Sequence, residues 1–361
     1  MKKGTGLVFV LALALCVLGV KAEELRTWRA MGGFTVQARF LEYEDGTVRL
    51  QRHNGELIEV RLERLTPADR REVQRLAGEA ARGSLPAGQF EVPSGRRELT
   101  WRNLNVGDHW PASMTEAEKE ALLGLGRGWQ HAETRFFLLH YQQMGYARTV
   151  ARQADFFYQF IAADLPGLQD RMGERKSSVV VVRNAREWQQ FVENAGVAPE
   201  WSAAYVHGHV MYLQDMGRSQ TNTHVLAHEM SHLVLNRFFV RPPPLWLNEG
   251  LAEWYGHMAW KAFKGQHVNP RREVGRLNNP MPLAQLFAAR TYPERREDIP
   301  RFYQTSHHLV GFLMLEKDNQ AFARFLRRVT VEGVEVMAAI EAEYGYGSLQ
   351  ELEAAFRRFV R

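Results

Sequence analysis

The sequence has a single cysteine and no long apolar run. Cys16 is the one cysteine among 361 residues, and it lies in a short apolar stretch near the N-terminus. A chain that starts after this stretch contains no cysteine, so it forms no internal disulfide in any redox compartment. Its stability must then come from side-chain packing, with a bound metal as a further source.

The apolar stretch from Leu7 to Val20 is the longest in the chain, and it is too short to span a membrane. It has about 14 residues, whereas a helix needs ~20 to cross a bilayer. Lys2 and Lys3 precede it, and a small-residue pattern ends at Ala22. This arrangement is typical of a cleavable secretory signal peptide over residues 1–22. We expect cleavage after Ala22 and a secreted or periplasmic protein without a stable membrane span; the alternative is a retained anchor.

A strong charge of one sign is also missing. The net charge is +5, and Lys2, Lys3 and Lys21 supply three of these charges with no acid before Glu23, so the part after residue 22 carries +2. It has no basic stripe interleaved with aromatic residues, which argues against nucleic acid as a partner. About 340 residues remain, a length that suits two domains or one large domain with an appendage.

Residues 23–82 predict a small β unit. Apolar and polar residues alternate in three runs, 34–40, 48–50 and 58–62. A period of two is typical of strands with one buried face. Asp45-Gly46 and Asn54-Gly55 separate the runs, where tight turns need a residue that tolerates positive φ. A short helix is predicted to begin at Thr66-Pro67, which would close the meander into a small barrel.

This unit resembles the SH3-like modules called SLA homology domains. The resemblance covers about fifty residues and rests on Arg26-Thr27-Trp28 at the start and Leu62-x-x-Leu65 at the end. It implies a binding or spacing module, without catalytic residues, that contacts a surface or a protein partner. The next residues, 83–100, are rich in Gly, Pro and Ser without periodicity, so they predict a linker to a second domain over 101–361.

The second domain begins with mixed strands and helices and becomes helical. The expected strands are 134–141, 177–182 and an extended segment 205–214, and the expected helices are 147–165 and 185–195. After Asn222 the pattern is helical almost to the end, interrupted by Pro242 to Pro244 and by loops around 265–300. A sheet-containing half followed by a helical half predicts an α+β architecture.

The stretch "HVLAHEMSHLVLN" places two histidines four residues apart in an apolar helix. Side chains at this spacing share one helix face, so the imidazoles of His228 and His232 can bind one ion. Glu229 is rotated by about 100°, near enough to reach a metal-bound water without ligating the metal. Burying these groups without partners would cost ~1–3 kcal/mol each. A metal relieves that cost, and a satisfied polar core is the alternative.

The third ligand is predicted in "LWLNEGLAEW", which follows the helix-breaking prolines. A catalytic zinc takes three protein ligands and keeps one position open. Glu249 lies on a second helix that the proline turn could bring back against the first, so it is the natural third ligand. Asn248 and Glu253 are expected to hold the histidine rings through the nitrogen that does not touch metal. The sequence therefore predicts one Zn²⁺ per chain.

Together these motifs resemble those of gluzincin metallopeptidases. The segment "WLNEGLA" is close to the third-ligand motif of the zinc aminopeptidases, and closer to a bacterial group called peptidase MA-like. The resemblance extends from about Glu133 to the C-terminus and includes "YQTSHHLVGFL" and "YGYGSLQELEAAFRRFV". It implies a zincin-like fold for residues 101–361 and zinc-dependent hydrolysis of a peptide or protein substrate.

The sequence differs from the zinc aminopeptidases in two features. Sixteen residues separate His232 from Glu249, slightly fewer than in the aminopeptidases. The Gly-x-Met-x-Asn segment with which those enzymes hold a free amino terminus is absent, so an endopeptidase is favoured over an aminopeptidase. Two other functions stay open: a weakly active or inactive metal-binding recognition protein, and a zinc amidase that acts on cell-wall material.

The predicted reaction uses Glu229 as general base, which takes a proton from the zinc-bound water and passes it to the departing amine. By resemblance, Tyr303 in "FYQTSHH" donates a hydrogen bond to the oxyanion, with His307 or His308 as alternatives. The extended segment 205–214 would pair with the substrate backbone. The remaining histidines are assigned no ligand role; His207 and His209 are expected to share one face of that strand, facing solvent or lining the cleft.

Overall fold

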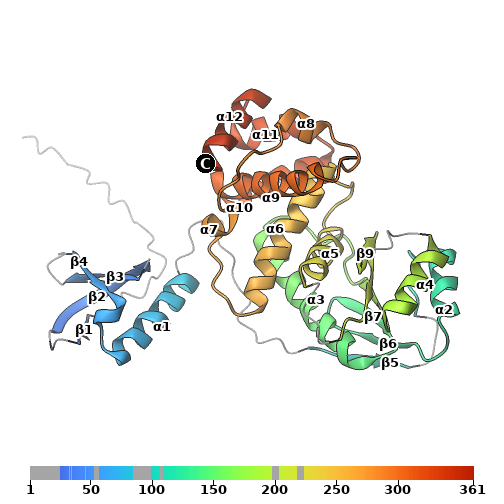
Figure 1. Cartoon of the computed structure of the whole chain (residues 1–361), viewed down its shortest axis with the longest axis horizontal. Helices are drawn as coiled ribbons and strands as arrows, with labels where there is room; N and C mark the ends of the chain where they lie inside the picture. The colour runs from blue at the N-terminus through green and yellow to red at the C-terminus, as the bar shows by residue number, and fades with distance from the viewer. Residues whose placement is uncertain are drawn as a thin grey trace, which may run out of the picture. The chain divides into compact units, whose positions relative to one another are not determined.

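The computed structural model describes residues 25–31, 33, 35–44, 46–52, 57–83, 99–105, 109–196, 203–217 and 223–361. The chain divides into two compact units between Ser84 and Leu85 (Figure 1), inside the segment predicted as a linker. The predicted signal peptide, most of that linker and the Asn54-Gly55 turn lie outside the described residues.

The first unit is a four-stranded antiparallel sheet with one helix. Its strands pair in chain order: β1 (Arg26–Arg29), β2 (Thr35–Glu44), β3 (Thr47–Arg52) and β4 (Leu57–Arg61). The alternating residues Ala38, Phe40, Val48 and Leu50 are buried around Trp28. The predicted strands are therefore confirmed where the chain is described.

The segments that follow the two edge strands, β1 and β4, are bridged to each other. A bridge links Ala30 to Leu65, the residue after the 3-10 turn η1 (Leu62–Arg64). Helix α1 (Pro67–Gly83) follows and has 17 residues, so the prediction of a short helix is wrong. Its sequence after the first turn consists mainly of good helix formers without a proline, which lets the helix continue. The Asp69 carboxylate accepts a hydrogen bond from Arg26 Nη2 at 2.8 Å and thus ties α1 to β1.

The second unit contains a six-stranded mixed sheet. In chain order its strands are β5 (Arg102–Leu104), β6 (Gln130–Glu133), β7 (Phe137–Tyr141), β8 (Ser177–Val182), β9 (Ala204–His207) and β10 (Val210–Gln214). Across the sheet the order is β5-β6-β7-β8-β10-β9. Strands β7, β8 and β10 are parallel, and the other pairs are antiparallel. Strand β9 therefore forms one edge and runs against its neighbour.

The prediction of one extended segment over 205–214 is wrong, because this stretch is a hairpin. Gly208 has a φ of +59°, in the left-handed region that glycine enters without steric cost. The chain reverses there, and His207 pairs with Val210. His207 ends β9 while His209 lies in the turn, so the two histidines do not share a strand face.

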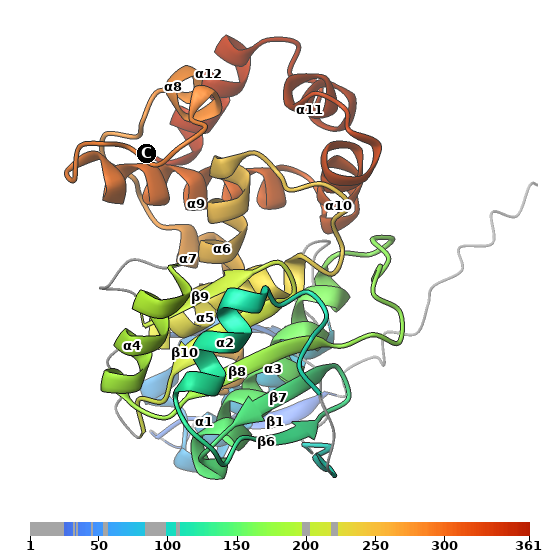
Figure 2. The ribbon, with the colours of Figure 1, turned by 90° about the vertical axis from the view of Figure 1, so that its right-hand side faces the viewer.

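Helices cover both faces of this sheet (Figure 2). Helices α3 (Met144–Asp164) and α5 (Thr223–Leu235) pack on one face, and α2 (Glu116–Gly124) and α4 (Ala185–Ala195) on the other. Strand β8 shows the division: Val179 and Val181 join the first core, and Val180 and Val182 join the second. Successive side chains of a strand point to opposite faces. This central strand is therefore buried on both sides.

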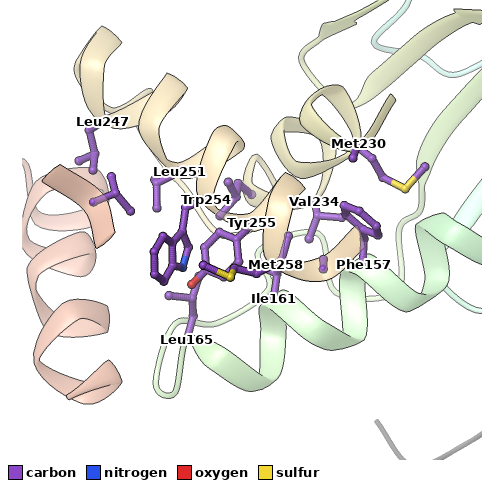
Figure 3. Close-up of a cluster of buried hydrophobic side chains, with 14 of the residues drawn as sticks. Phe157, Ile161, Leu165, Met230, Val234, Leu247, Leu251, Trp254, Tyr255 and Met258 are labelled. Atoms are coloured by element: carbon purple, nitrogen blue, oxygen red, sulfur yellow. The ribbon is translucent and has the colours of Figure 1, made fainter. Parts of the chain in front are cut away.

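Helix α6 (Leu245–Phe263) packs against α3, α5 and α9 (Asp298–Glu316). Figure 3 shows Phe157 and Ile161 of α3, Val234 of α5 and Met258 of α6 in one apolar cluster. This packing holds α5 and α6 side by side at the centre of the second unit.

The rest of the chain is helical, as predicted. It forms α7 (Pro270–Val274), α8 (Leu283–Ala288), α10 (Asn319–Arg327), the π-helical segment η2 (Arg328–Glu332), α11 (Val336–Tyr344) and α12 (Leu349–Phe359), in addition to α9. Pro242 to Pro244 fall between α5 and α6, where a break was expected. An α+β architecture with a small N-terminal strand unit and a helical C-terminal half is thus confirmed. Within the described ranges, no helix combines the length and apolar character needed to traverse a bilayer.

Candidate metal centre

Two adjacent helices bring three candidate metal ligands together. His228 and His232 lie one turn apart on α5, and Glu249 lies in the first half of α6. The Nε2 atoms of the two histidines are 3.1 Å apart. Glu249 Oε2 lies 3.1 Å from His228 Nε2 and 3.6 Å from His232 Nε2. These atoms are close enough to hold one metal ion.

The spacing of these atoms fits a tetrahedral zinc ion. Zinc bonds to nitrogen and oxygen place neighbouring ligand atoms roughly 3.3 Å apart in a tetrahedron. The three separations, 3.1, 3.1 and 3.6 Å, bracket this value. Two imidazoles and one carboxylate are also a ligand set that zinc accepts in catalytic sites. The donor set therefore fits zinc in both distance and chemistry.

Glu253 fixes the orientation of the first histidine. Its Oε1 lies 2.9 Å from His228 Nδ1, and its Oε2 lies 3.2 Å from His224 Nε2. A carboxylate next to Nδ1 favours the tautomer that carries its proton there, which leaves Nε2 free to bind a metal. Glu253 thus contacts His228 through the ring nitrogen that faces away from Glu249, as the sequence suggested.

The charges of the centre depend on one another. Burial raises the pKa of Glu249, but hydrogen bonds with His228 and His232 outweigh this and hold the pKa well below its usual range. Burial lowers the pKa of His228, whereas its bonds to Glu249 and Glu253 raise it to about 10. In the absence of a metal, the carboxylates of Glu249 and Glu253 on either side of His228 therefore favour its protonated form.

Glu229 stands apart from the three ligand candidates. It lies next to His228 on α5, and this helix packs against the edge strand β9. Burial raises the pKa of this carboxyl, although His232 and His228 oppose the shift. The carboxyl group therefore lies close enough to the candidate ligands for their charges to act on its pKa.

Asn248 contacts a carboxylate and not a histidine ring. Its Nδ2 donates to Glu249 Oε1 at 3.3 Å. The two residues are neighbours on α6, so the short amide side chain reaches the adjacent carboxylate. This contact differs from the one that the sequence predicted, although Asn248 does lie beside a candidate ligand.

Two tyrosines border the centre. Tyr303 lies on α9 with its ring 6.0 Å from that of His228. Its ring stacks on the ring of Tyr292, with the two ring centroids 6.1 Å apart. Tyr292 lies between α8 and α9 and donates to Glu249 Oε1 at 3.0 Å. Burial raises the pKa of both phenols, so both keep their protons as donors.

Sequence reasoning missed Tyr292 and His224. Tyr292 lies in an irregular segment 43 positions from Glu249, and neither a motif nor a periodic pattern marks it. His224 was detectable, because it precedes His228 by one helical turn and so extends the same face.

The alternative oxyanion donors contact other groups. His307 packs against Trp254 and His257, and burial lowers its pKa to about 4. His308 Nδ1 lies 2.7 Å from the backbone oxygen of Gln304. These contacts do not involve the three candidate ligands, whereas Tyr303 packs beside His228.

Comparison with known proteins bears on the first unit. Residues 20–81 match the family of SLA1 homology domain 1 (SHD1). The chain matches no curated protein. The N-terminal module is therefore similar to SLA1 homology domain 1, as its residues indicated, and the peptidase resemblance of the second unit stays a prediction.

Proposed function

We propose that the second unit is a zinc-dependent peptidase of the gluzincin type with a zincin-like fold. The observation that carries this proposal is the convergence of His228 Nε2, His232 Nε2 and Glu249 Oε2 at tetrahedral spacing. These side chains would hold one zinc ion per chain. When bound, zinc supplies Lewis acidity that polarises a carbonyl group and lowers the pKa of water.

Glu229 acts as the general base of this reaction. It accepts a proton from the attacking water and returns the proton to the departing amine. A carboxyl group with a raised pKa suits both steps, because it is a stronger base when ionised and holds the proton long enough to transfer it. Tyr303 donates a hydrogen bond to the oxyanion of the tetrahedral intermediate.

Strand β9 is suited to an extended peptide. It is an edge strand that pairs with β10 on one side, and it packs on α5, the helix that carries Glu229. A substrate strand can add to such an edge through backbone hydrogen bonds, which tolerate varied side chains. Internal peptide bonds are the favoured substrate, because the segment that would bind a free amino terminus is absent from the sequence.

The first unit serves as an interaction module in this proposal. Its match to SLA1 homology domain 1 supports contact with a protein partner or a surface. The proposal also includes export from the cytoplasm and cleavage after Ala22. Mass spectrometry of the exported protein tests this part: we expect Glu23 at the N-terminus, and a protein that retains residues 1–22 contradicts it.

Glu229→Gln tests the proposed chemistry separately from zinc binding. We expect one zinc per chain by elemental analysis in both the parent and this variant. The variant should lose about 10²–10⁴-fold in the cleavage rate of a peptide library read by mass spectrometry. Glu193→Gln, an exposed change of the same kind on α4, is the matched control and should cleave at the parent rate.

Three outcomes would refute parts of this proposal. A chain that stays free of zinc after incubation with zinc removes the metal centre. A Glu229→Gln variant that cleaves as fast as the parent removes Glu229 as the base. Cleavage of cell-wall amides in place of library peptides would favour a zinc amidase, and zinc binding without any hydrolysis would favour a recognition protein.

A further inference from the structure

The two oxygens of the Glu249 carboxylate have different partners. Oε2 faces the histidines, at 3.1 Å from His228 Nε2 and 3.6 Å from His232 Nε2. Oε1 accepts a hydrogen bond from the Tyr292 hydroxyl at 3.0 Å and one from Asn248 Nδ2 at 3.3 Å. The metal side and the hydrogen-bonded side of this carboxylate are therefore separate.

The separate partners of Oε1 and Oε2 determine how many oxygens Glu249 can offer to a metal. A carboxylate binds a metal through one oxygen or through both. Two hydrogen bonds to Oε1 occupy its lone pairs and hold it away from the point where Oε2 meets the histidine nitrogens. One-oxygen binding leaves the fourth position of a tetrahedral ion open, as a catalytic zinc requires.

Tyr292 is fixed well enough to set this geometry. Its ring stacks on Tyr303 with an interplanar angle of 18° and meets Phe302 edge-on at 6.3 Å. Helix α9 supplies both of these contacts, while the hydroxyl reaches Glu249 on α6. The side chain is about half exposed, at 49%. Tyr292 thus joins α9 and α6 from a segment that has no regular structure of its own.

We propose that Tyr292 is a positioning residue that keeps Glu249 a one-oxygen metal ligand. This inference rests on the proposed zinc centre. Tyr292 acts through Glu249, so its removal should change metal affinity and coordination while leaving the folded protein intact. Asn248 also donates a hydrogen bond to Glu249 Oε1 from within α6, and Tyr292 adds a second donor from outside that helix.

Tyr292→Phe tests the inference, because it removes the hydroxyl and keeps the stacked ring. We expect the zinc dissociation constant, measured by competition with a chelator, to rise about 10–100-fold. The Tm of the metal-free protein should stay unchanged. X-ray absorption of the zinc-loaded variant should show a second carboxylate oxygen near the metal. The matched control is Tyr346→Phe, which removes a tyrosine hydroxyl that donates to Glu316 Oε1 at 2.7 Å and should leave zinc binding unchanged.

A second variant tests whether the two donors to Glu249 Oε1 act together. Asn248→Ala removes the other donor to Oε1, and the double variant should bind zinc more weakly than either single variant. A Tyr292→Phe variant with the zinc affinity and coordination of the parent overturns this inference and leaves the proposed function standing. A parent protein that binds no zinc overturns both.

Discussion

At the scale of single residues, the buried His140 makes the free energy of unfolding depend on pH. It is fully buried in β7, stacks on Trp110 at 5.0 Å, and has its Nδ1 2.8 Å from Nδ1 of His131. Burial lowers the pKa of His140 to about 3. The unfolded chain takes up a proton at this position near pH 6.5, but the folded chain does not. The free energy of unfolding must therefore fall as the pH drops from about 6.5 toward 3.

His140→Phe should remove this pH dependence while keeping an aromatic ring on Trp110. Between about pH 6 and pH 4, we expect the free energy of unfolding of the metal-free parent to fall by about 1.4 kcal/mol per pH unit more than that of the variant. Urea unfolding at several pH values measures the difference. His267→Phe, at an exposed position, is the control and should follow the parent; equal slopes for parent and His140→Phe would refute the argument.

Tyr303→Phe separates oxyanion stabilisation from metal binding. The variant keeps the ring beside His228 and loses the hydroxyl. We expect kcat to fall by about 10²–10³-fold, with unchanged zinc content by elemental analysis. Unchanged kcat would mean that another group supplies the hydrogen bond.

At the scale of elements, two glycines allow α6 to pack closely against its neighbouring helices. A Cβ at Gly250 would lie 2.5 Å from the backbone oxygen of Ser306 in α9, and a Cβ at Gly256 would lie 3.2 Å from the backbone nitrogen of His228 in α5. At Gly250 a side chain would force the backbone apart, whereas at Gly256 it would need a small movement of α5. Gly256 therefore allows α6 to lie close to the histidine helix α5, and Gly250 allows α6 to lie close to α9.

Gly250→Ala should disturb both stability and the metal centre. We expect a loss of about 1–3 kcal/mol in the free energy of unfolding, because α6 or α9 must shift, together with weaker zinc binding by titration. Gly145→Ala is the matched control: it lies in the first turn of α3, and an added Cβ there meets nothing within 4 Å. A Gly250→Ala variant as stable as this control would contradict the close approach of the two helices.

For the whole molecule, the two units have separate cores. The core of the first unit surrounds Trp28, and the candidate metal ligands all lie in the second, which has its own core clusters. A chain without residues 23–83 should therefore bind one zinc ion with the affinity of the full chain and cleave the same peptides. Zinc titration and the peptide library measure both properties, and a loss of zinc binding on deletion would show that the metal centre needs the module.

The sequence by itself determined the features that depend on neighbours along the chain. Helix α4 covers the predicted residues 185–195 and β8 the predicted 177–182, because side-chain periodicity reports the buried face of each element. The one-turn spacing of His228 and His232 on α5 follows from the same helical geometry. The proline break before Glu249 was equally visible, since proline cannot continue a helix.

Only the tertiary structure decided which distant groups meet. The reversal at Gly208 made a hairpin from the stretch that was predicted as one extended segment, and its edge strand β9 packs on α5, the helix that carries Glu229. The contact between Tyr292 and Glu249 depends on how α9 packs on α6. Contacts of this kind arise from packing between segments far apart in the chain, and no local pattern encodes them. The metal motif was therefore readable from the sequence, whereas the hydrogen bonds around Glu249 came from the fold.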